Sequence, residues 1–328
     1  MKKDSADNIV ITGGTGFIAT NLIEYYLKNT DAQIISITKN TQASYAQKRI
    51  SDLIAAYPSK FKNYWCDITD YVKLNTILNR EKPNQIIHLA AEADVSRSFD
   101  YPHDFLNTNL IGTYNLLEWI RNNGLEDTKM LYFSTDEVFS EPDHLSVETE
   151  RLYPKNPYSA SKAAAEQYIY AWNECYGTKI QVARPVNNYG PYQGPNRLFA
   201  KTIINAINNI PITLFRETKQ HKRWWLYVGD TCNAVDIIIN KGDPKGIYHI
   251  TSDIEFTVEE VVLKILDYMG KKELFKGYRE YRPKDDENYA LDGSKLKDLG
   301  WAPKYTFEEG IEKTIEWYKQ NLEWFTKI

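Results

Sequence analysis

Short apolar segments alternate along this chain with longer segments in which apolar residues recur at helical spacing. The first kind has the length of buried β-strands and comprises residues 9–12, 33–37, 64–68, 85–91, 130–133, 180–185 and 246–250. The second kind predicts amphipathic helices and comprises residues 20–29, 70–80, 108–122, 160–176 and 307–321. Strands that alternate with helices in this way favour a parallel, doubly wound sheet, so the expected fold class is α/β.

The carboxyl-terminal part departs from this alternation, but without a clean linker, an internal repeat or a low-complexity segment. Residues 186–193 form a turn-forming stretch rich in hydrogen-bonding side chains, and residues 213–223 are polar and basic. We therefore expect a second, smaller domain that is interleaved with the sheet domain. A length of 328 residues accommodates both.

The overall composition is that of a soluble globular protein, with 42% apolar and 26% charged residues. A net charge of −4 and a pI near 5.9 provide no basic surface for nucleic acid. The cysteines, Cys66, Cys175 and Cys232, are scattered, so neither a disulfide framework nor a metal site is expected. The amino terminus lacks the apolar core of a signal peptide, and no segment has the length of a membrane span, which predicts a cytoplasmic location.

A glycine-rich turn follows the first predicted strand at once. It reads Gly13-Gly-Thr-Gly16-Phe17-Ile18-Ala19 and leads into the first predicted helix. Glycines at a strand-to-helix turn let the backbone close tightly and let a pyrophosphate lie at the helix amino terminus. Ala19 takes the third small position, which this fingerprint tolerates. The motif predicts a dinucleotide site and assigns Gly13, Gly16, Phe17 and Ile18 to it.

The end of the second predicted strand bears on the choice of dinucleotide. It reads Thr38-Lys39, where an enzyme that binds a free ribose 2′-hydroxyl would carry Asp or Glu. Lys39 instead offers a positive charge that suits a 2′-phosphate, so NADP is favoured over NAD. The alternative is that Lys39 is a solvated loop residue.

The third and fourth predicted strands add small and polar groups to the same site. Asp67 and Ile68 close the third strand, where the carboxylate can meet an adenine edge. Ala90 and Ala91 close the fourth strand and leave room for a cofactor. His88 lies inside that apolar run, so it is interpreted as a core residue rather than a catalyst.

Residues 130–137 read Met-Leu-Tyr-Phe-Ser-Thr-Asp-Glu, an apolar run that ends in a hydroxyl pair and two adjacent carboxylates. Open α/β sheets place their chemistry beyond the carboxyl ends of their strands. Thr135, Asp136 and Glu137 are therefore candidate catalytic residues. A solvated pair of acids at the start of a loop is the alternative for the two carboxylates.

Tyr158 and Lys162 are four residues apart near the start of the predicted helix 160–176, so they share one of its faces. An ammonium near a phenol favours the phenolate and lowers the pKa of the tyrosine. Tyr158 can then serve as a general base near neutral pH. Both side chains are also expected to contact the cofactor.

Together these motifs resemble the extended short-chain dehydrogenase/reductases and, among them, the nucleotide-diphosphate-hexose 4,6-dehydratase family. The resemblance covers nearly the full length and is carried by residues 12–18, 88–92, 109–113, 134–138, 157–162, 187–193 and 225–228. The acid pair beside Thr135 is the most discriminating motif. Related epimerases need no acid pair there, whereas dehydratases must remove a C5 proton and expel the C6 hydroxyl.

The resemblance implies a three-step cycle that leaves the cofactor as it began. Tyr158 takes the proton of the sugar 4-hydroxyl as hydride leaves C4 for the nicotinamide, and Thr135 holds the C4 oxygen. Glu137 then abstracts the C5 proton while Asp136 protonates the departing C6 hydroxyl, after which hydride returns to C6. Opposite roles for adjacent carboxylates require environments that split their pKa values.

For the substrate, the resemblance assigns Arg223 and Arg282 to the diphosphate, Asn188 to the nucleotide, and Arg197 to the same binding site. Arg184 is interpreted as a brace for a strand end. The chain departs from the family around the sugar and base pockets, for example at Trp224, where an aspartate is usual. These departures argue against thymidine and glucose and leave open a UDP, GDP or CDP sugar, including an N-acetylated one.

The resemblance also divides the chain and implies its assembly. The dinucleotide-binding Rossmann domain is expected at residues 1–183 plus about 224–252, and the nucleotide-sugar-binding domain at 184–223 plus about 253–328. A homodimer through helices 108–122 and 160–176 is expected, with no nucleic-acid or membrane partner. The apolar positions on those helices serve either the dimer interface or the internal core; they are Leu116, Ile120, Ile169 and Trp172.

Two other functions remain open. One is a different reaction of the same family, that of a nucleotide-sugar 4-epimerase or a decarboxylase. The other is a dinucleotide-binding scaffold without catalysis, because a fold alone does not fix function. A scaffold has no need for the whole set of catalytic candidates, and replacing Glu137 by Gln would separate an epimerase from a dehydratase.

Overall fold

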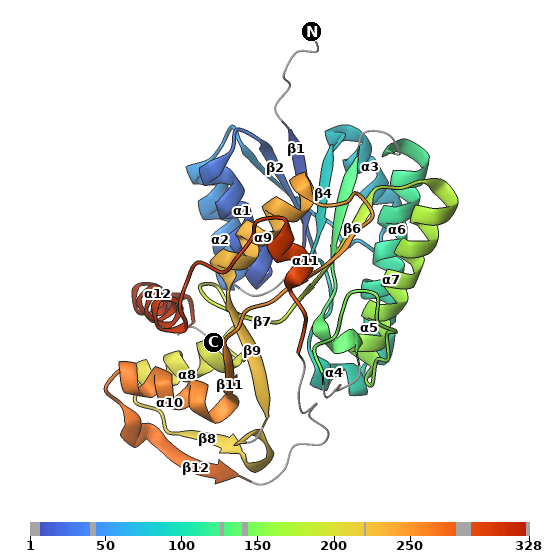
Figure 1. Cartoon of the computed structure of the whole chain (residues 1–328). Coiled ribbons are helices and arrows are strands. Elements are labelled where there is room, and N and C mark those ends of the chain that lie inside the picture. Colours follow the sequence, from blue (N-terminus) through green and yellow to red (C-terminus); the bar gives the residue numbers. More distant parts are fainter. Residues whose placement is uncertain are drawn as a thin grey trace.

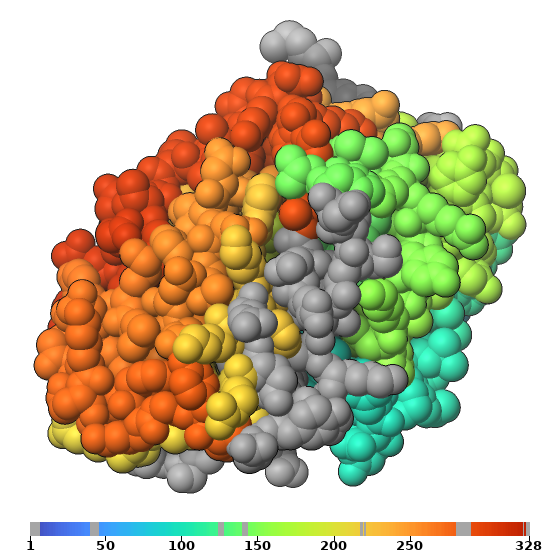
Figure 2. Space-filling model, turned by 60° about the horizontal axis from the view of Figure 1, so that its bottom comes forward, coloured from blue at the N-terminus to red at the C-terminus, as the bar shows by residue number. Residues whose placement is uncertain are grey.

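The computed structural model describes residues 7–39, 44–124, 128–139, 144–219, 221–279 and 290–325. These residues form a larger lobe built around a parallel sheet and a smaller lobe that lies below it in Figure 1. Figure 2 shows the face on which residues of the smaller lobe (yellow to orange) lie on one side and those of α4 to α7 (turquoise to green) on the other. The chain crosses between the lobes more than once, because it leaves the larger sheet after β6 and returns to it at β10.

The larger lobe contains a seven-stranded sheet in which every pairing is parallel, and this confirms the predicted α/β class. The strand order is β10-β6-β5-β4-β1-β2-β3. The strands are β1 (Asn8–Thr12), β2 (Gln33–Thr38), β3 (Phe61–Trp65), β4 (Gln85–His88), β5 (Lys129–Phe133), β6 (Ile180–Pro185) and β10 (Ile247–Ile250). The order reverses between β1 and β4, and open sheets bind their ligands at such a point, beyond the carboxyl ends of the strands.

Helices cover both faces of this sheet. On one face lie α1 (Phe17–Asn29), α2 (Ser44–Ala56) and α9 (Val228–Lys241), and on the other α3 (Tyr71–Glu81), α6 (Gly112–Trp119) and α7 (Pro157–Tyr176). Successive strand residues alternate between the two cores, so that Ile9 and Ile11 pack in the first and Val10 in the second. Because the strands are buried on both sides, they have the nearly continuous apolar sequences from which they were predicted.

The smaller lobe has two short sheets of order β11-β9-β7 and β12-β8. Its strands are β7 (Asn187–Tyr189), β8 (Ile212–Phe215), β9 (Lys222–Tyr227), β11 (Glu255–Thr257) and β12 (Phe275–Arg279). Its helices are α8 (Leu198–Ile207), α10 (Val258–Tyr268) and α12 (Phe307–Gln320). An aromatic core joins them, in which the rings of Tyr189 and Phe199 stack with their centroids 4.4 Å apart. Three short helices complete the fold: α4 (Val95–Asp100), α5 (Pro102–Phe105) and α11 (Ser294–Asp298).

Most predicted elements occur close to their expected bounds, with three differences. The helix expected at 108–122 is a longer helical segment, in which two π-helical turns, Leu106–Ile111 and Ile120–Gly124, flank α6. The strand expected at 64–68 lies at Phe61–Trp65, where it pairs with β2. The helices α2, α8, α9 and α10 and the strands β7, β8, β11 and β12 were not predicted.

The apolar positions considered for a dimer interface belong mainly to the core of the larger lobe. Leu116, Ile120 and Ile169 are fully buried in the second core, and Trp172 packs against it while partly buried. Of the two roles considered for these positions, the structure therefore assigns Leu116, Ile120 and Ile169 to the internal core.

We propose two domains with the boundaries predicted from the sequence and one change. Leu291, Leu296 and Trp301 pack in the first core of the larger lobe, so residues 290–301 join the dinucleotide-binding domain. Across the described ranges, none of the helices combines the length and the apolar character that crossing a bilayer requires.

Candidate active site

The turn between β1 and α1 has a backbone shape that requires glycine. Gly13 has a φ of +74°, and a Cβ there would lie 2.8 Å from the Cα of Ala90. The amide of Gly16 donates to the carbonyl of Gly13 at 2.7 Å, which closes the turn. Among the described residues, no side chain caps α1, which begins at Phe17. The amides at the start of α1 thus face a narrow cradle that a Cβ would fill, and this geometry fits the pyrophosphate of a dinucleotide.

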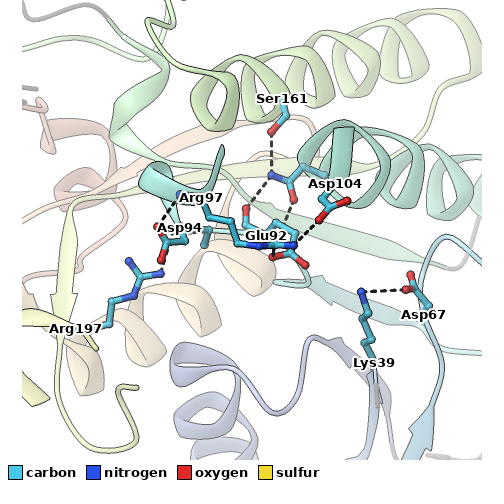
Figure 3. A network of polar contacts seen from close by, with 10 residues as sticks. Lys39, Asp67, Glu92, Asp94, Arg97, Asp104, Ser161 and Arg197 are labelled. Atoms are coloured by element: carbon cyan, nitrogen blue, oxygen red, sulfur yellow. Dashed lines mark hydrogen bonds and ion pairs between the residues drawn. The ribbon is translucent and has the colours of Figure 1, made fainter. Parts of the chain in front are cut away.

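The ends of β2 and β3 face each other across one edge of this cradle. Thr38 is 3% exposed, and its hydroxyl lies 2.9 Å from that of Thr15. The ammonium of Lys39 lies 3.6 Å from the carboxylate of Asp67 (Figure 3). Burial acts to raise the pKa of Asp67, but hydrogen bonds from Thr69 and the charge of Lys39 outweigh it and lower this pKa. Lys39 is therefore an ion-pair partner of Asp67 although much of its side chain is exposed.

His88 is a core residue, as predicted. It is 1% exposed, with Nδ1 2.7 Å from the hydroxyl of Thr12 and Nε2 3.0 Å from that of Thr113. The Thr113 hydroxyl donates to the carbonyl of Asn109, so the imidazole carries its proton on Nε2 and accepts from Thr12 at Nδ1. Burial, and then the charge of Lys162, lower the pKa of His88 to about 3, so the ring is neutral.

Ala90 and Ala91 follow β4 and lie beside the glycine turn. The amides of Leu89 and Ala90 each donate to the hydroxyl of Thr12 at 3.1 Å. Thr12, the last residue of β1, therefore holds the end of β4 in place. Both alanines are half-buried, so they form a wall of small side chains against which a flat ring can lie.

The acid pair follows β5 in one 3₁₀ turn, Asp136–Val138. Thr135 accepts from the amide of Glu137 at 3.3 Å, and its hydroxyl donates to Oδ1 of Asp136 at 3.1 Å. Asp136 is 5% exposed, and burial raises its pKa to about 6 against the Thr135 hydrogen bond and the charge of Arg223. Glu137 is less buried, and Asn156 donates to its carboxylate at 3.3 Å. The two carboxylates are thus neither equivalent nor simply solvated.

Tyr158 and Lys162 both lie on the buried side of α7, but their predicted electrostatic coupling is wrong. Burial raises the pKa of Tyr158 above its ordinary value, the charge of Glu137 adds to this, and a hydrogen bond with Thr135 acts in the opposite direction. The ammonium of Lys162 donates to the carbonyl of Phe133 at the end of β5. Burial lowers the pKa of Lys162 to about 7, against the charge of Glu166.

A polar network that was not predicted connects the segment after β4 to α7 (Figure 3). The side-chain nitrogen Nδ2 of Asn109 donates to the backbone carbonyl of Glu92 at 3.0 Å and to the hydroxyl of Ser161 at 2.9 Å. Ser161 in turn donates to the carbonyl of Tyr158 at 2.6 Å. Glu92 also pairs with Arg97 at 2.7 Å. The network holds the backbone of Tyr158 in place relative to the segment that follows β4. In the sequence, the Asn-Leu-Ile-Gly-Thr motif at 109–113 could have indicated this network.

A second group that was not predicted lies behind the site. Glu166 and Arg184 form an ion pair at 2.6 Å with both side chains almost fully buried, which confirms Arg184 as a brace for the end of β6. Ser134 also donates to Glu166, and the charge of Glu166 raises the pKa of Lys162 against the effect of burial. The available signal was an acid four residues after Lys162, on the same helix face.

Three of the predicted substrate residues line one cavity of about 530 Å³ in the smaller lobe. They are Asn188, Arg197 and Arg223, and the cavity lies between α8 and the strands β8 and β9. Arg197 also donates to the carbonyl of Ala93 at 3.2 Å, which ties the cavity to the segment after β4. The fourth, Arg282, lies outside the described residues.

The known proteins that are similar to this chain match it over nearly its full length. A family model described as GDP-mannose 4,6 dehydratase matches residues 10–314. The dTDP-glucose 4,6-dehydratase of Shigella flexneri is 35% identical, over 98% of this chain and 95% of its own. The dTDP-glucose 4,6-dehydratase 1 of Escherichia coli K12 has the same identity and the same coverage.

Solved structures show that enzymes with two different reactions share this fold. The dTDP-glucose 4,6-dehydratase of Bacillus anthracis in complex with NAD has a TM-score of 0.88 at 32% identity, covering 98% of this chain and 99% of that one. The UDP-glucose 4-epimerase of Thermus thermophilus in complex with NAD has a TM-score of 0.85 at 28% identity, covering 95% and 99%. Because these scores are nearly equal, only the sequence relationship and the residues of the site separate the two reactions.

Proposed function

The chain belongs to the nucleotide-diphosphate-hexose 4,6-dehydratase family, and we propose that it converts a nucleotide-diphosphate hexose into the 4-keto-6-deoxy sugar. The observation that carries this proposal is the pair of adjacent carboxylates beyond β5. Burial raises the pKa of Asp136 to about 6, which suits a proton donor, whereas Glu137 is less buried and accepts a hydrogen bond from Asn156, which suits a base. Elimination of water needs an acid and a base at once, and C4 epimerisation does not.

The glycine turn at Gly13 and Gly16 would hold a nicotinamide dinucleotide, which would supply the hydride acceptor for C4 of the sugar and the hydride donor for C6. Tyr158 takes the proton of the C4 hydroxyl, and Thr135 holds the C4 oxygen through its hydroxyl. Because burial raises the pKa of Tyr158, a positive charge is needed to favour the phenolate in this step, and the charge of Arg197 acts on Tyr158 in that direction. The C4 carbonyl acidifies the C5 proton, which Glu137 removes while Asp136 gives a proton to the C6 oxygen. That oxygen leaves as water, and Glu137 returns its proton to C5 when hydride reaches C6. The proton that Tyr158 took makes up the one that Asp136 gave, so the sugar loses one water and the protein ends as it began.

The substrate is held from the smaller lobe. Arg197 and Arg223 face the same cavity, and a guanidinium presents a fork of donors that matches phosphate oxygens. Both arginines also act on the catalytic residues, since Arg197 lowers the pKa of Tyr158 and Arg223 lowers that of Asp136. A diphosphate between them would place the attached hexose beside Thr135.

For the cofactor, we propose that the site accepts NADP. Thr38 stands where a carboxylate would select a free 2′-hydroxyl, and the nearest described carboxylate, that of Asp67, is engaged by Lys39. The solved relatives hold NAD, so the preference is to be measured directly. Purified protein is denatured, and the released dinucleotide is identified by mass; NAD alone would refute the proposal.

We further propose that the chain acts as a cytoplasmic homodimer. The two long helical segments expose apolar side chains side by side with the buried ones, namely Leu106 at 47%, Ile111 at 42% and Tyr168 at 42%. Large exposed apolar groups on neighbouring helices are typical of an interface. Sedimentation of the wild type and of Ile111→Asp tests this: a dimer should dissociate in the variant, and a monomeric wild type would refute it.

The proposed reaction is tested by incubating purified protein with dTDP-, UDP-, GDP- and CDP-hexoses without added reductant. Loss of one water from a sugar, with no build-up of reduced cofactor, is the expected result. An unchanged mass with altered stereochemistry would instead identify a 4-epimerase, the alternative that the fold comparison leaves in place. No reaction with any sugar would favour the binding-only scaffold.

A further inference from the structure

The cavity that holds Asn188, Arg197 and Arg223 is lined by neutral residues and by charged residues that are all basic, as far as the described residues go. Its volume is about 530 Å³, and its lining includes four basic side chains: Arg197, Lys201, Arg223 and Arg279. Among its described lining residues there is no Asp or Glu. The cavity therefore offers positive charge and hydrogen-bond donors well beyond the two arginines assigned to phosphate.

The four basic side chains fall into two pairs at different distances from the reaction centre. Arg197 and Arg223 form the near pair, since their charges act on Tyr158 and Asp136 respectively. Lys201 is four residues beyond Arg197, one turn and about 6 Å farther along α8. Lys201 and Arg279 form the far pair. This pair begins where a diphosphate held by the near pair would end.

Arg279 forms the opposite wall of the far part. It lies on β12, which pairs with β8 so that Arg279 is directly beside Phe215. Its guanidinium carbon is 4.1 Å from the centroid of the Phe215 ring. Both residues line the cavity, so the ring of Phe215 holds the guanidinium of Arg279 at this wall through a cation–π contact.

The two charged groups of the far part suit one edge of a nucleobase better than another. Lys201 and Arg279 can only donate hydrogen bonds. The other polar side chains nearby can donate or accept hydrogen bonds; they are Thr202, Asn205 and Thr213. Discrimination between bases therefore depends on Lys201 and Arg279. An exocyclic amino group would meet donors and a positive charge, whereas a carbonyl oxygen would be satisfied by them.

We infer that Lys201 and Arg279 are specificity-determining residues that select a substrate whose base carries a carbonyl at C4 of a pyrimidine or C6 of a purine: uracil, thymine or guanine, and not cytosine or adenine, which carry an amino group there. This inference rests on the proposed function, because it takes the cavity to be the nucleotide part of the substrate site. It narrows the substrate to nucleotide sugars of keto bases.

The test measures binding rather than turnover. Titration calorimetry of the purified holoprotein with UDP, dTDP, GDP, CDP and ADP should give the first three an affinity on the order of tenfold higher or more, because a mismatched base leaves donors unpaired. Lys201→Met and Arg279→Met should each weaken the binding of UDP, dTDP and GDP by about tenfold. The binding of CDP should be unchanged, so that the preference between bases disappears. Lys276→Met, on β12 but not in the cavity lining, is the matched control and should behave as the wild type.

Three results would overturn the inference: CDP or ADP binding as tightly as UDP, the two variants weakening all diphosphates equally, or the control changing the preference. Arg223→Met separates the two halves of the cavity, because it should weaken all five diphosphates alike. If the base preference is observed but no hexose loses water, the dehydratase proposal fails while the inference stands. If a CDP-hexose is the one that reacts, the dehydratase stands and the inference fails.

Discussion

The guanidinium carbon of Arg49 lies 3.8 Å from the centroid of the Tyr192 ring. Arg49 is 1% exposed on α2, and its Nη1 donates to the hydroxyl of Thr20 at 2.8 Å. Thr20 donates to the carbonyls of Gly14 and Gly16 in the dinucleotide turn, at 2.9 Å each. Tyr192 belongs to the segment through which the chain enters the smaller lobe. The stacked pair therefore joins the cofactor turn to the substrate lobe.

Replacing Tyr192 by Leu should lower the free energy of unfolding by about 3 kcal/mol, because the variant removes the ring that covers a buried guanidinium. Tyr192→Phe keeps that ring and loses only the hydrogen bond from the hydroxyl to Glu24, so it should cost about 1 kcal/mol. Urea unfolding of both variants measures the difference. Equal losses would show that stacking on Arg49 contributes nothing.

Replacing Glu137 by Gln should stop the reaction after the oxidation of C4. The amide keeps the shape of the side chain but cannot take the C5 proton, so turnover should fall by about 10²- to 10⁴-fold. Reduced nicotinamide should then accumulate, which its near-ultraviolet absorbance reports. Glu316→Gln, in a surface ion pair with Lys319 on α12, is the control and should react normally. If the Glu137→Gln enzyme still turned over its sugar, Glu137 would not be the base that removes the C5 proton.

Replacing Asp136 by Asn should abolish dehydration and at the same time stabilise the protein at neutral pH. Burial raises the pKa of Asp136 from 3.8 to about 6, so the folded state holds a proton that the unfolded state releases. The stability from this proton is complete below about pH 4 and is lost as the pH rises through about 6, up to roughly 3 kcal/mol in total. Urea unfolding should show variant and wild type equal near pH 4 and the variant more stable near pH 7. A difference that does not change with pH would contradict this origin.

Replacing Gly13 by Ala should release the dinucleotide as well as strain the backbone. A positive φ costs a side chain about 1–3 kcal/mol by itself, and here the new Cβ would also meet the Cα of Ala90 at 2.8 Å. Gly177 is a matched control, since its φ is +69° and a Cβ there would have nothing within 4 Å. Both variants should lose thermal stability, but only Gly13→Ala should purify without its dinucleotide, measured by absorbance. Retention of the dinucleotide would show that the turn can shift.

The places of the candidate catalytic residues could be predicted from hydrophobic periodicity and local motifs, whereas their roles came from the family resemblance. A buried strand that ends at Phe133 puts Thr135, Asp136 and Glu137 beyond the edge of the sheet. The helix that carries Tyr158 was predicted from residue 160, and it begins three residues earlier because Asn156 caps it and Pro157 opens it. The same reasoning located the glycine turn.

The environments of these groups could not be predicted in the same way, because they depend on contacts between distant segments. Tyr158 and Lys162 share a helix face, yet the ammonium is held by the carbonyl of Phe133, and burial governs the pKa of the phenol. Arg49 lies in a polar segment that looks like a surface helix, and only the fold buries it against Tyr192. At β3, the apolar residues after Tyr64 indicated a later strand, but pairing with β2 sets its register.

The return of the chain to the larger sheet has a consequence for biosynthesis. The edge of β6 is covered by β10, and β10 leaves the ribosome only after α8, β8, β9 and α9 have been made. Until Ile247–Ile250 emerges, a nascent chain carries an open, apolar strand edge, which is a template for aggregation. We therefore expect nascent chains arrested before Ile247 to depend on chaperones, and chains arrested beyond Ile250 to complete the sheet without them.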